Sequence, residues 1–546
     1  MQPLPDDAYV VDVDGGDIAL AGKTDSGTLY AVYDYLKQQG CRWIVPGAEG
    51  EIVPARTALA AVASKVEAPD YDCRGYHVTT QDYFRKPDGT EGWVSINLDE
   101  YFDWCVRNRM NGIGFSGIQS YDFGAHRDHG WIQLSNHSFN SVVAPHEKFF
   151  EDHPEWYPLI RGERTPVSHL KPYFPNQLCL SNLSLQDHTV ELAVEFFKTN
   201  PQMRTFPLIP MDGASLWCEC EPCKALDPPG MDWSLHYDEG LVIGMTDRYV
   251  HYANEIAERV STVYPEKQIL IQAYSYTLRP PVRESVHPNV TVRFANLSRP
   301  GVGPLGKSIL DVEDPMWAVW RRQLDGWTRA GANFSHYNYM DWTNPDVALF
   351  WCFSLSDVTR NLHQVYHFRK LFGETETNQR ISPMMFHVLT ETLWDVDTDY
   401  KAVIREVCDN YYGPVADDMV DYQMKMDRAL IESTAWKRWK QKVGRLWGEG
   451  YRNVQHVDIG LDLLQEGTRQ LAAMSSQVKD DPVLARRIAH ARLGHAFLTY
   501  LQAKNEPDEA VETDEIAAEA VKQVNALRSE FDIMIKRFSS EKLPTP

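Results

Sequence analysis

The chain has 546 residues, more than one hydrophobic core usually organises, so we expect roughly two to four domains. Its formal net charge of −22 disfavours nucleic-acid binding. It contains no run of ~18 apolar residues, the length that would predict a transmembrane helix. The odd number of cysteines, 9, argues against a disulfide scaffold, while 16 Trp and 26 Tyr suit stacking on sugar rings.

Residues 1–67 are predicted to form a small α/β domain. Strands are expected over Tyr9–Val13 and Ile18–Ala21, and a helix starts near Asp25 and ends at Gly40. No signal peptide is visible, but a strand so close to the start is consistent with removal of an upstream segment. The protein is then secreted or periplasmic, and otherwise cytoplasmic.

Residues 68–395 alternate between strand-like and helix-like stretches, which predicts an α/β fold of the (β/α)8-type barrel class. The expected strands are Asp72–Val78, Gly112–Ser116, Gln177–Leu180, Thr205–Pro210, Gln268–Tyr274, Val290–Ala295, Asn333–Met340 and Val365–Leu371. The expected helices include Leu98–Arg109, Ser184–Thr199, Glu239–Tyr264, Met316–Ala330 and Asp346–Leu362.

Residues 396–546 are predicted to be a helical domain in which the strands stop. The basic cluster of this region is interpreted as a solvated helix face; its members are Lys437, Arg438, Lys440, Lys442 and Arg445. The sequence leaves open whether the helices brace the barrel or form a homodimer.

Candidate catalytic residues are sought just past the strands, because the chemistry of a barrel lies on those loops. Asp212 follows the fourth strand and is followed by Gly213, which places a carboxylate well for acid–base work. His137 lies in the long loop after the second strand and is a candidate general acid. A purely structural histidine is the alternative.

Candidate substrate-binding residues carry the side chains that hydrogen-bond to sugar hydroxyls or stack on sugar rings. They are Arg74, Asn182, Trp217, Tyr274, Tyr276, Arg293, Asn338, Tyr339 and Asp341. Two of them have a structural alternative, since Arg74 could form an internal ion pair and Asn182 could cap a helix.

The run Trp217-Cys218-Glu219-Cys220-Glu221-Pro222-Cys223 is the one motif with metal-ligand character. Its spacing differs from that of a zinc ribbon, and no second pair of His or Cys residues is obvious. A disulfide or a buried thiol cluster is therefore favoured, and no metal and no cofactor are assigned.

Several of these motifs together resemble known glycosidases. The first domain resembles the one that precedes many hexosaminidase and α-glucuronidase barrels, through Gly27-Thr28-Leu29-Tyr30, Gly40-Cys41-Arg42-Trp43 and Pro46-Gly47. The rest resembles a bacterial barrel family, through Arg74-Gly75, Asn136-His137-Ser138-Phe139, His153-Pro154-Glu155-Trp156, Gln177-Leu178-Cys179-Leu180-Ser181-Asn182, the cysteine run, Leu393-Trp394-Asp395 and Tyr411-Tyr412-Gly413-Pro414. Some members are classed as glycoside hydrolase family 163, and the broader relatives are the family 20 hexosaminidases.

The resemblance implies an endo-β-N-acetylglucosaminidase that acts on complex N-glycans and uses the 2-acetamido group of the substrate as the nucleophile. Asp212 looks like the strand-four position where family 20 enzymes keep an Asp-Glu pair, and Arg74 resembles their sugar-gripping arginine. The chain departs from these patterns, since Gly213 follows Asp212 and Met211 precedes it. The proton donor therefore stays open among Glu219, Glu221, Glu374, Asp341 and His137.

Three main functions remain, and a metal enzyme is a fourth, weaker alternative that elemental analysis of the purified protein would test. The first is a retaining hydrolase of N-acetylhexosamine-containing glycans with substrate assistance. The second is an exo-acting sialidase or uronidase, in which Arg74 or Arg293 holds a carboxylate and a His137/Asp212 pair inverts the anomeric carbon. The third is a non-catalytic glycan-binding protein. The expected partner is in each case a glycan, with no nucleic acid and no membrane.

Overall fold

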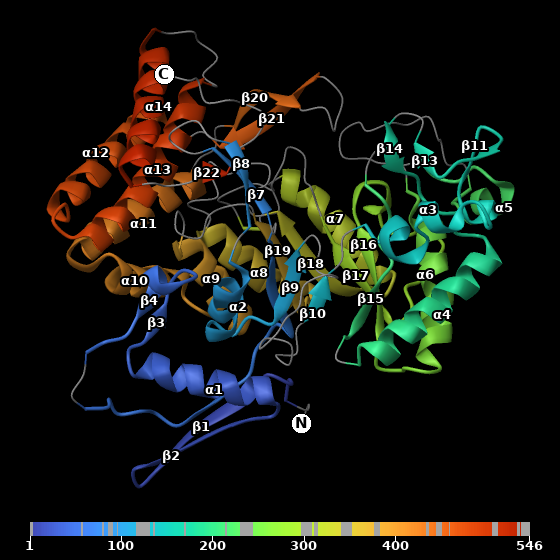
Figure 1. Ribbon diagram of the computed structural model, residues 1–546, viewed down its shortest axis with the longest axis horizontal. Coiled ribbons are helices and arrows are strands. Elements are labelled where there is room, and N and C mark those ends of the chain that lie inside the picture. The colour runs from blue at the N-terminus through green and yellow to red at the C-terminus, as the bar shows by residue number, and fades with distance from the viewer. Residues whose placement is uncertain are drawn as a thin grey trace.

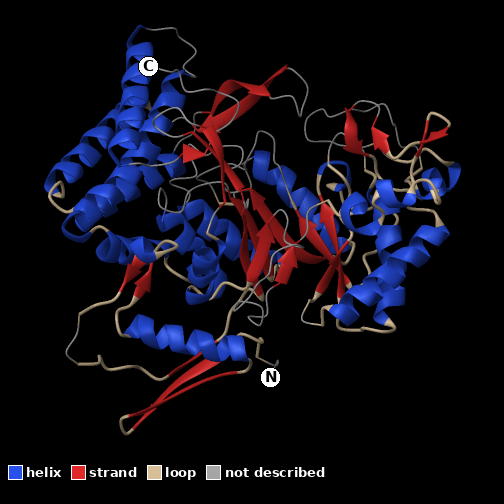
Figure 2. Cartoon of the chain, in the orientation of Figure 1, coloured by secondary structure: helices blue, strands red, loops and turns tan. Residues whose placement is uncertain are grey.

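The computed structural model describes most of the chain. The described residues are 4–55, 58–78, 81–85, 91–95, 97–115, 132–134, 137–168, 171–201, 203–212, 216–229, 244–295, 308–310, 315–339, 352–375, 383–432, 436–443, 450–457, 459–504, 511–531 and 535–536. These ranges contain both helices and strands, joined by loops (Figure 2). No helix among them is both long and apolar enough to cross a membrane.

The N-terminal unit is a small antiparallel sheet with one helix on it, at the lower left of Figure 1. Strands β1 (Tyr9–Asp14), β2 (Asp17–Gly22) and β5 (Lys65–Glu67) pair in the order β2-β1-β5. Helix α1 (Asp25–Gln38) begins after Thr24, whose side chain accepts the Gly27 N–H, as a helix start requires. The short pair β3 (Arg42–Trp43) and β4 (Glu51–Ile52) completes the unit.

The centre of the molecule is an eight-stranded sheet in which every pairing is parallel. Its order is β10-β9-β6-β19-β18-β17-β16-β15. The strands are β6 (Cys73–Val78), β9 (Gly112–Phe115), β10 (Ile132–Leu134), β15 (Thr205–Pro207), β16 (Gln268–Ala273), β17 (Val290–Phe294), β18 (Asn333–Tyr339) and β19 (Lys370–Thr375). Seven of the expected strands are present, although β19 begins five residues later than expected.

One expected strand is wrong. Residues 177–180 form no strand, and the sheet instead contains β10 (Ile132–Leu134), which the sequence had placed inside a long loop. Leu178 and Leu180 are buried, so the apolar pattern was real. Their segment uses its hydrogen bonds on the loop after β15 instead of on a strand ladder, as when the Gln177 N–H donates to the Leu216 carbonyl at 3.1 Å.

The two ends of the sheet approach each other. Strands β10 and β15 are in contact, and just beyond them the Ser138 N–H donates to the Ile209 carbonyl at 2.8 Å. Parallel pairing and crossover helices establish the mixed α/β class. Closure into a (β/α)8 barrel stays a prediction that this approach favours.

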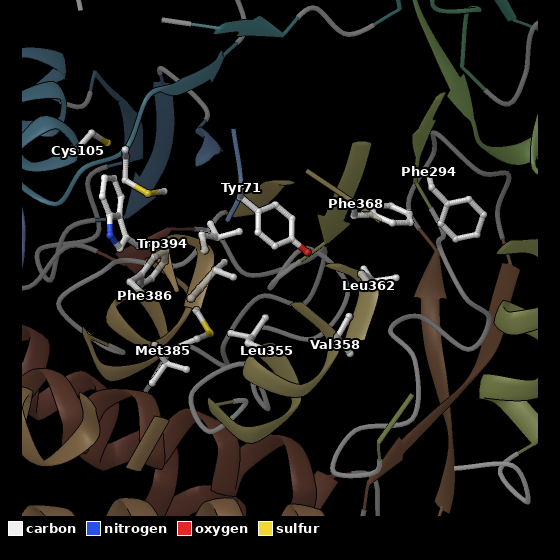
Figure 3. Close-up of a cluster of buried hydrophobic side chains, with 14 of the residues drawn as sticks. Tyr71, Cys105, Phe294, Leu355, Val358, Leu362, Phe368, Met385, Phe386 and Trp394 are labelled. Atoms are coloured by element: carbon white, nitrogen blue, oxygen red, sulfur yellow. The ribbon is translucent and has the colours of Figure 1, made fainter. Parts of the chain in front are cut away.

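Helices cover the sheet and join its strands, as expected for parallel pairing. They are α2 (Leu98–Arg107), α4 (Leu183–Thr199), α6 (Thr246–Ser261), α7 (Pro315–Arg329), α8 (Cys352–Tyr366) and α9 (Pro383–Trp394). Figure 3 shows Leu355 of α8 beside Met385 of α9 within the main core, with Val358 and Leu362 further along α8 toward Phe368. The buried Tyr71 hydroxyl donates to the Thr359 carbonyl there at 2.7 Å.

Shorter elements decorate the loops of the sheet. They are β7 (Gln81–Arg85), β8 (Glu91–Ser95), α3 (His146–Phe149), β11 (Leu159–Ile160), β12 (Glu163–Arg164), β13 (Val167–Ser168), β14 (Lys171–Pro175) and α5 (Glu221–Ala225). The pairs β7–β8, β11–β12 and β13–β14 are antiparallel.

The C-terminal region is mostly helical, but it also contains strands, which corrects the prediction that strands are absent from residues 396–546. Its helices are α10 (Tyr400–Tyr411), α11 (Ala416–Glu432), α12 (Leu461–Gln477), α13 (Pro482–Lys504) and α14 (Val511–Phe531). Between α11 and α12 lies an antiparallel hairpin of β20 (Trp436–Val443) and β21 (Gly450–Val457), and β22 (Ile535–Lys536) pairs with β7.

The basic cluster lies on this hairpin and on no helix. Lys437, Arg438, Lys440 and Lys442 are in β20, and Arg445 lies outside the described residues. The spacing of Trp436 and Trp439 suits a helix, but these residues pair across the hairpin with Val457 and Val454. Such pairing partners follow later in the chain, where a local periodicity does not reveal them.

A partly buried carboxylate on α9 joins the N-terminal unit to the rest of the molecule. Glu391 accepts from Lys37 Nζ of α1 at 2.6 Å and pairs with Arg109, the residue two past α2. Burial alone would raise the pKa of Glu391, but the adjacent Arg109 and Lys37 charges outweigh it and hold the pKa well below its usual range.

Candidate active site

The candidate site is built where strands β15 and β16 end. Asp212 lies five residues past β15 and Tyr274 directly follows β16, so both side chains stand at the carboxyl edge of the sheet. The Tyr274 hydroxyl donates to Asp212 Oδ1 at 3.2 Å, and both residues are partly buried. Parallel strands bring their carboxyl ends to one edge, which is why residues 62 positions apart meet.

His137 joins this pair from the segment after β10. Its ring lies with its centroid 6.4 Å from that of Tyr274, and its Nδ1 is 2.6 Å from the Pro210 carbonyl oxygen. A carbonyl only accepts, so Nδ1 carries a proton and the lone pair of the neutral imidazole is on Nε2. Asp212 and His137, the predicted catalytic residues, thus both lie next to Tyr274.

His137 is held in a strained backbone conformation. Its φ of 32° lies in the left-handed region, which a residue with a Cβ adopts at a cost. The adjacent Ser138 fixes it, because Ser138 Oγ accepts from the Ile209 N–H at 2.7 Å and donates to the Pro207 carbonyl at 2.9 Å. The conformation of the histidine is therefore set by the segment that leads to Asp212.

The residue before Asp212 is fixed by a second clamp. Gln177 accepts from the Met211 N–H at 2.8 Å through Oε1 and donates to the Met211 carbonyl at 2.7 Å through Nε2. Gln177 is 1% exposed, so the amide works in a dry environment and its two bonds are well defined. The sequence analysis missed this role because it assigned residues 177–180 to a strand.

Arg293 lies on the same side of the sheet as this group, whereas Tyr276 packs against the main core. Arg293 in β17 is fully buried, donates from Nε to Gln272 Oε1 at 3.0 Å and stacks 4.9 Å from the Tyr337 ring centroid. Tyr337 in turn belongs to the small cluster against which Tyr274 packs. Tyr276 is partly buried two residues beyond Tyr274.

Arg74 does not reach this site, which corrects the prediction that it binds substrate. Successive strand residues point to opposite faces, and Cys73 before it packs with Leu270 and Tyr337. Arg74 therefore points to the other face. There its guanidinium pairs with Asp7 at 2.6 Å and donates to two main-chain carbonyls, those of Tyr71 and Arg109. The ion pair named as the alternative is the one observed.

Two further predicted binding residues have structural roles. Asn182 caps α4, accepting the Leu185 N–H at 2.9 Å, and its amide donates toward the Glu155 carbonyl at 3.4 Å. Trp217 is 7% exposed and belongs to the main core, so little of its ring remains for a sugar to stack on. Its indole N–H has no hydrogen-bond partner among the described residues.

The remaining candidates fall at or beyond the limits of the described residues. Asn338 and Tyr339 end β18, where their backbones pair with Gly373 and Glu374 of β19. Asp341 lies outside the described residues. Glu374 thus stands at the carboxyl edge of a central strand, which keeps it among the possible proton donors.

Two other possible proton donors are directed elsewhere. Glu219 accepts the Arg161 N–H at 2.8 Å. Glu221 is in the first turn of α5, with a side chain 88% exposed and an ion pair to Lys224 at 3.3 Å. His137 is the candidate that lies against Tyr274, the residue that is hydrogen-bonded to Asp212.

A cluster of four buried cysteines lies beside the site. Cys218, Cys220 and Cys223 of the loop after Asp212 meet Cys179, and all four sulfur atoms lie within 4.8 Å of one another. The sequence analysis had looked for a second pair of ligands and so missed the single Cys179, although it stands in a motif already noted. Four thiols at this spacing can hold a metal ion.

A family model described as "Domain of unknown function (DUF4838)" matches residues 45–425. No curated protein matches the sequence. The fold, however, resembles solved glycoside hydrolases of low sequence identity.

A family 138 glycoside hydrolase targeting pectin rhamnogalacturonan II is 11% identical, with a TM-score of 0.48; 97% of this chain and 68% of that one are covered. A family 89 glycoside hydrolase from Clostridium perfringens with 2-acetamido-1,2-dideoxynojirmycin is 12% identical, with a TM-score of 0.52 and coverage of 94% and 61%.

A doubly Glu-to-Gln-substituted form of the Clostridium perfringens family 89 enzyme, in complex with its substrate GlcNAc-α-1,4-galactose, is 11% identical, with a TM-score of 0.52. It is matched over 96% of this chain and 60% of its own, so the chain spans about three fifths of the length of the family 89 structures. At these identities the family 89 likeness establishes a shared fold.

Proposed function

The chain belongs to the DUF4838 family, and we propose that it is a glycoside hydrolase acting on glycans that contain N-acetylhexosamine. The observation that carries the proposal is the meeting of Asp212, Tyr274 and His137 at the carboxyl edge of the parallel sheet, where such folds keep their chemistry. Two further points support the sugar class: the sequence resemblance to families 163 and 20, and the GlcNAc-containing substrate of a structural neighbour.

Substrate assistance is the mechanism that suits a site with Asp212 as its central carboxylate. The acetamido oxygen of the substrate attacks the anomeric carbon, and the bond to the leaving oxygen breaks. Positive charge then develops on the acetamido group, where a carboxylate accepting its N–H stabilises the transition state. Tyr274 positions Asp212 for this role through its hydroxyl.

The leaving oxygen needs a proton donor, and we propose His137 for it, with Glu374 as the alternative. With Nδ1 bonded to the Pro210 carbonyl, the imidazolium form of His137 donates from Nε2. The two candidates are separated by leaving-group dependence. If His137 is the acid, His137→Ala should abolish cleavage of a natural disaccharide but not of an aryl glycoside, whose phenol leaves without a proton. If Glu374 is the acid, Glu374→Gln should have this effect instead.

A sialidase or uronidase is less well supported, because Arg74 is committed to Asp7 and cannot clamp a substrate carboxylate. Arg293 is the remaining candidate for that task, and it is already bound to Gln272. The glycan-binding alternative differs from both in predicting affinity without turnover.

The test is hydrolysis of a panel of glycosides by the wild-type protein. The panel holds aryl N-acetylglucosaminides and N-acetylgalactosaminides of both anomers, an aryl glucuronide, an aryl sialoside, a complex N-glycan and GlcNAc-α-1,4-galactose. We expect release from N-acetylhexosaminides and inhibition by a thiazoline mimic of the cyclised acetamido intermediate. Cleavage of the glucuronide or sialoside alone would overturn the proposed substrate, and binding without any cleavage would overturn the proposed activity.

Asp212→Asn is expected to abolish this turnover while the thermal unfolding temperature stays close to that of the wild type. The substitution keeps the shape of the side chain and removes the charge that stabilises the transition state. Glu221→Gln is the matched control, since its exposed carboxylate is expected to leave the rate unchanged. A wild-type rate in Asp212→Asn contradicts the assignment of the site.

A further inference from the structure

The four clustered cysteines come from two separate segments of the chain. Cys179 precedes α4, whereas Cys218, Cys220 and Cys223 lie on the loop that leads into α5. All four are at most 8% exposed. Cys220 is the residue that precedes α5 and Cys223 lies in its first turn, so the start of the helix holds both thiols on the same side as Cys218 and Cys179.

The spacing of the sulfur atoms matches one tetrahedral metal ion. Cys179 Sγ lies 3.6 Å from that of Cys218, 3.7 Å from that of Cys220 and 3.8 Å from that of Cys223. A zinc–thiolate bond of about 2.3 Å in tetrahedral geometry separates neighbouring sulfurs by about 3.8 Å. A disulfide would instead draw two of the sulfurs to ~2.05 Å and leave the others apart.

We propose that Cys179, Cys218, Cys220 and Cys223 bind one zinc ion as a tetrathiolate. Binding displaces the four thiol protons into solvent and forms four Zn–S bonds, with no oxidation or reduction. All four positions of the ion are then filled by protein, which makes the site structural and closed to substrate. The proposal does not depend on glycoside hydrolysis.

The surroundings of the cluster suit the charge of such a site, since four thiolates around Zn2+ carry a net charge of −2. The Leu159 N–H donates to Cys218 Sγ at 3.2 Å, and Arg164 Nη1 lies 3.8 Å from the same atom. Ser181 Oγ is 3.1 Å from Cys223 Sγ. Such donors stabilise metal-bound thiolates and fix their orientation.

The position of the ion gives it a task in the fold. The segment 176–179 is hydrogen-bonded to the loop after β15 at two places. Gln177 contacts Met211, next to Asp212, and Asn176 Oδ1 accepts the Leu216 N–H at 3.0 Å, next to Trp217. The zinc would join the same two segments at Cys179 and Cys218. It would thereby fix the far end of the loop whose near end carries Asp212.

The first test is elemental analysis of the full chain, purified without chelators under reducing conditions from cells supplied with zinc. We expect about one zinc ion per chain. Cys179→Ser and Cys223→Ser are expected to lose most of it, while Cys105→Ser, a buried cysteine of α2 remote from the cluster, keeps it. Wild-type protein that takes up no zinc after reduction and incubation with the ion overturns the proposal.

A second test uses the wild-type protein alone, in case the serine variants fail to fold. A mercurial reagent that modifies thiols is titrated in, and a zinc-sensitive dye reports release of the ion. Release in step with modification of four thiols is expected, and so is the intense visible spectrum of a tetrahedral cobalt tetrathiolate after exchange for Co2+. Bound iron in place of zinc, or two disulfides among these cysteines in a peptide map, overturns the assignment.

Discussion

At the scale of the residue, the Tyr274 hydroxyl donates a hydrogen bond to Asp212. A phenol that donates to a carboxylate orients it toward the place where positive charge develops. The tyrosine therefore acts through Asp212, as a positioning residue, and its loss should reduce catalysis without removing the carboxylate.

Tyr274→Phe is expected to lower kcat by about tenfold or more, because a hydrogen bond to a charged group contributes about 1.5–3 kcal/mol. The measurement is steady-state kinetics on the substrate that the panel identifies, with KM and the unfolding temperature followed in parallel. Tyr264→Phe, beyond the end of α6, is the matched control. Equal kcat values for Tyr274→Phe and the wild type would show that the hydroxyl does not position Asp212.

Sequence reasoning placed Asp212 and Tyr274 just past strand ends, where the structure has them, because a strand end is visible as the close of an apolar run; their catalytic roles stay a prediction. It failed on Arg74 because a shift of one residue moves a strand side chain to the other face. Which face of the sheet a given side chain points to is fixed by the packing of the strand against its neighbours. Only the packing of Cys73 against Leu270 and Tyr337 revealed it.

At the scale of the element, helix α9 is held against the N-terminal unit by Glu391. This carboxylate pairs with Lys37 and Arg109 in a largely buried position, where removing one partner leaves the other charges uncompensated. The neighbouring pair of Arg42 and Glu406 joins the same unit to α10, but Glu406 is 44% exposed. The two contacts thus differ mainly in their access to water.

Glu391→Gln is expected to lower the free energy of unfolding by about 3 kcal/mol or more, since it leaves Arg109 buried without a counter-charge. Glu406→Gln should cost less than about 1 kcal/mol, as exposed ion pairs do. Urea unfolding at neutral pH measures both. A smaller loss for Glu391→Gln than for Glu406→Gln would contradict the argument from burial.

The difference in unfolding free energy between the wild type and Glu391→Gln should depend on pH in a defined direction. The folded-state pKa of Glu391 lies below its unfolded value of about 4.3, so its ion pairs stabilise the protein fully above that pH. As the pH falls through the folded pKa the stabilisation is lost. The gap between wild type and Glu391→Gln should therefore narrow below pH ~4.3.

Elements with strong local patterns were predictable and the others were not. Helices α4 and α7 and strands β16 to β18 lie within one or two residues of the expected ranges. The hairpin β20–β21 and the three-residue β10 were missed, because their stability comes from pairing partners and not from their own periodicity. The cysteine cluster escaped for the same reason, since Cys179 is 39 positions from Cys218.

At the scale of the whole molecule, buried histidines make the fold sensitive to mild acid. Burial lowers the pKa of His336 in β18 to about 3, and burial lowers that of His495 in α13 to about 4 against the opposing effect of the Leu464 carbonyl. Both rings bind a proton more readily in the unfolded chain, at pH ~6.5. Stability is therefore lost progressively as the pH falls below that value.

His336→Phe is expected to reduce this acid sensitivity. The ring lies edge-on between Trp320 and Phe368, and its nitrogens have no partner among the described residues, so a phenyl ring suits the site. The unfolding free energy of the variant should depend less on pH, by about 1.4 kcal/mol per unit between pH ~6 and ~4. Parallel stability curves for variant and wild type would contradict the prediction.

The pairing of Lys37 with Glu391 has a consequence for how the protein is made. The two residues are 354 positions apart in the sequence, and Arg109 is 282 positions from the same carboxylate. At roughly 5–20 residues per second, a ribosome needs about 20 to 70 s to bridge the longer interval. The N-terminal unit therefore emerges before the anion of its Lys37 ion pair has been synthesised, and this ion pair forms only after helix α9 has left the ribosome.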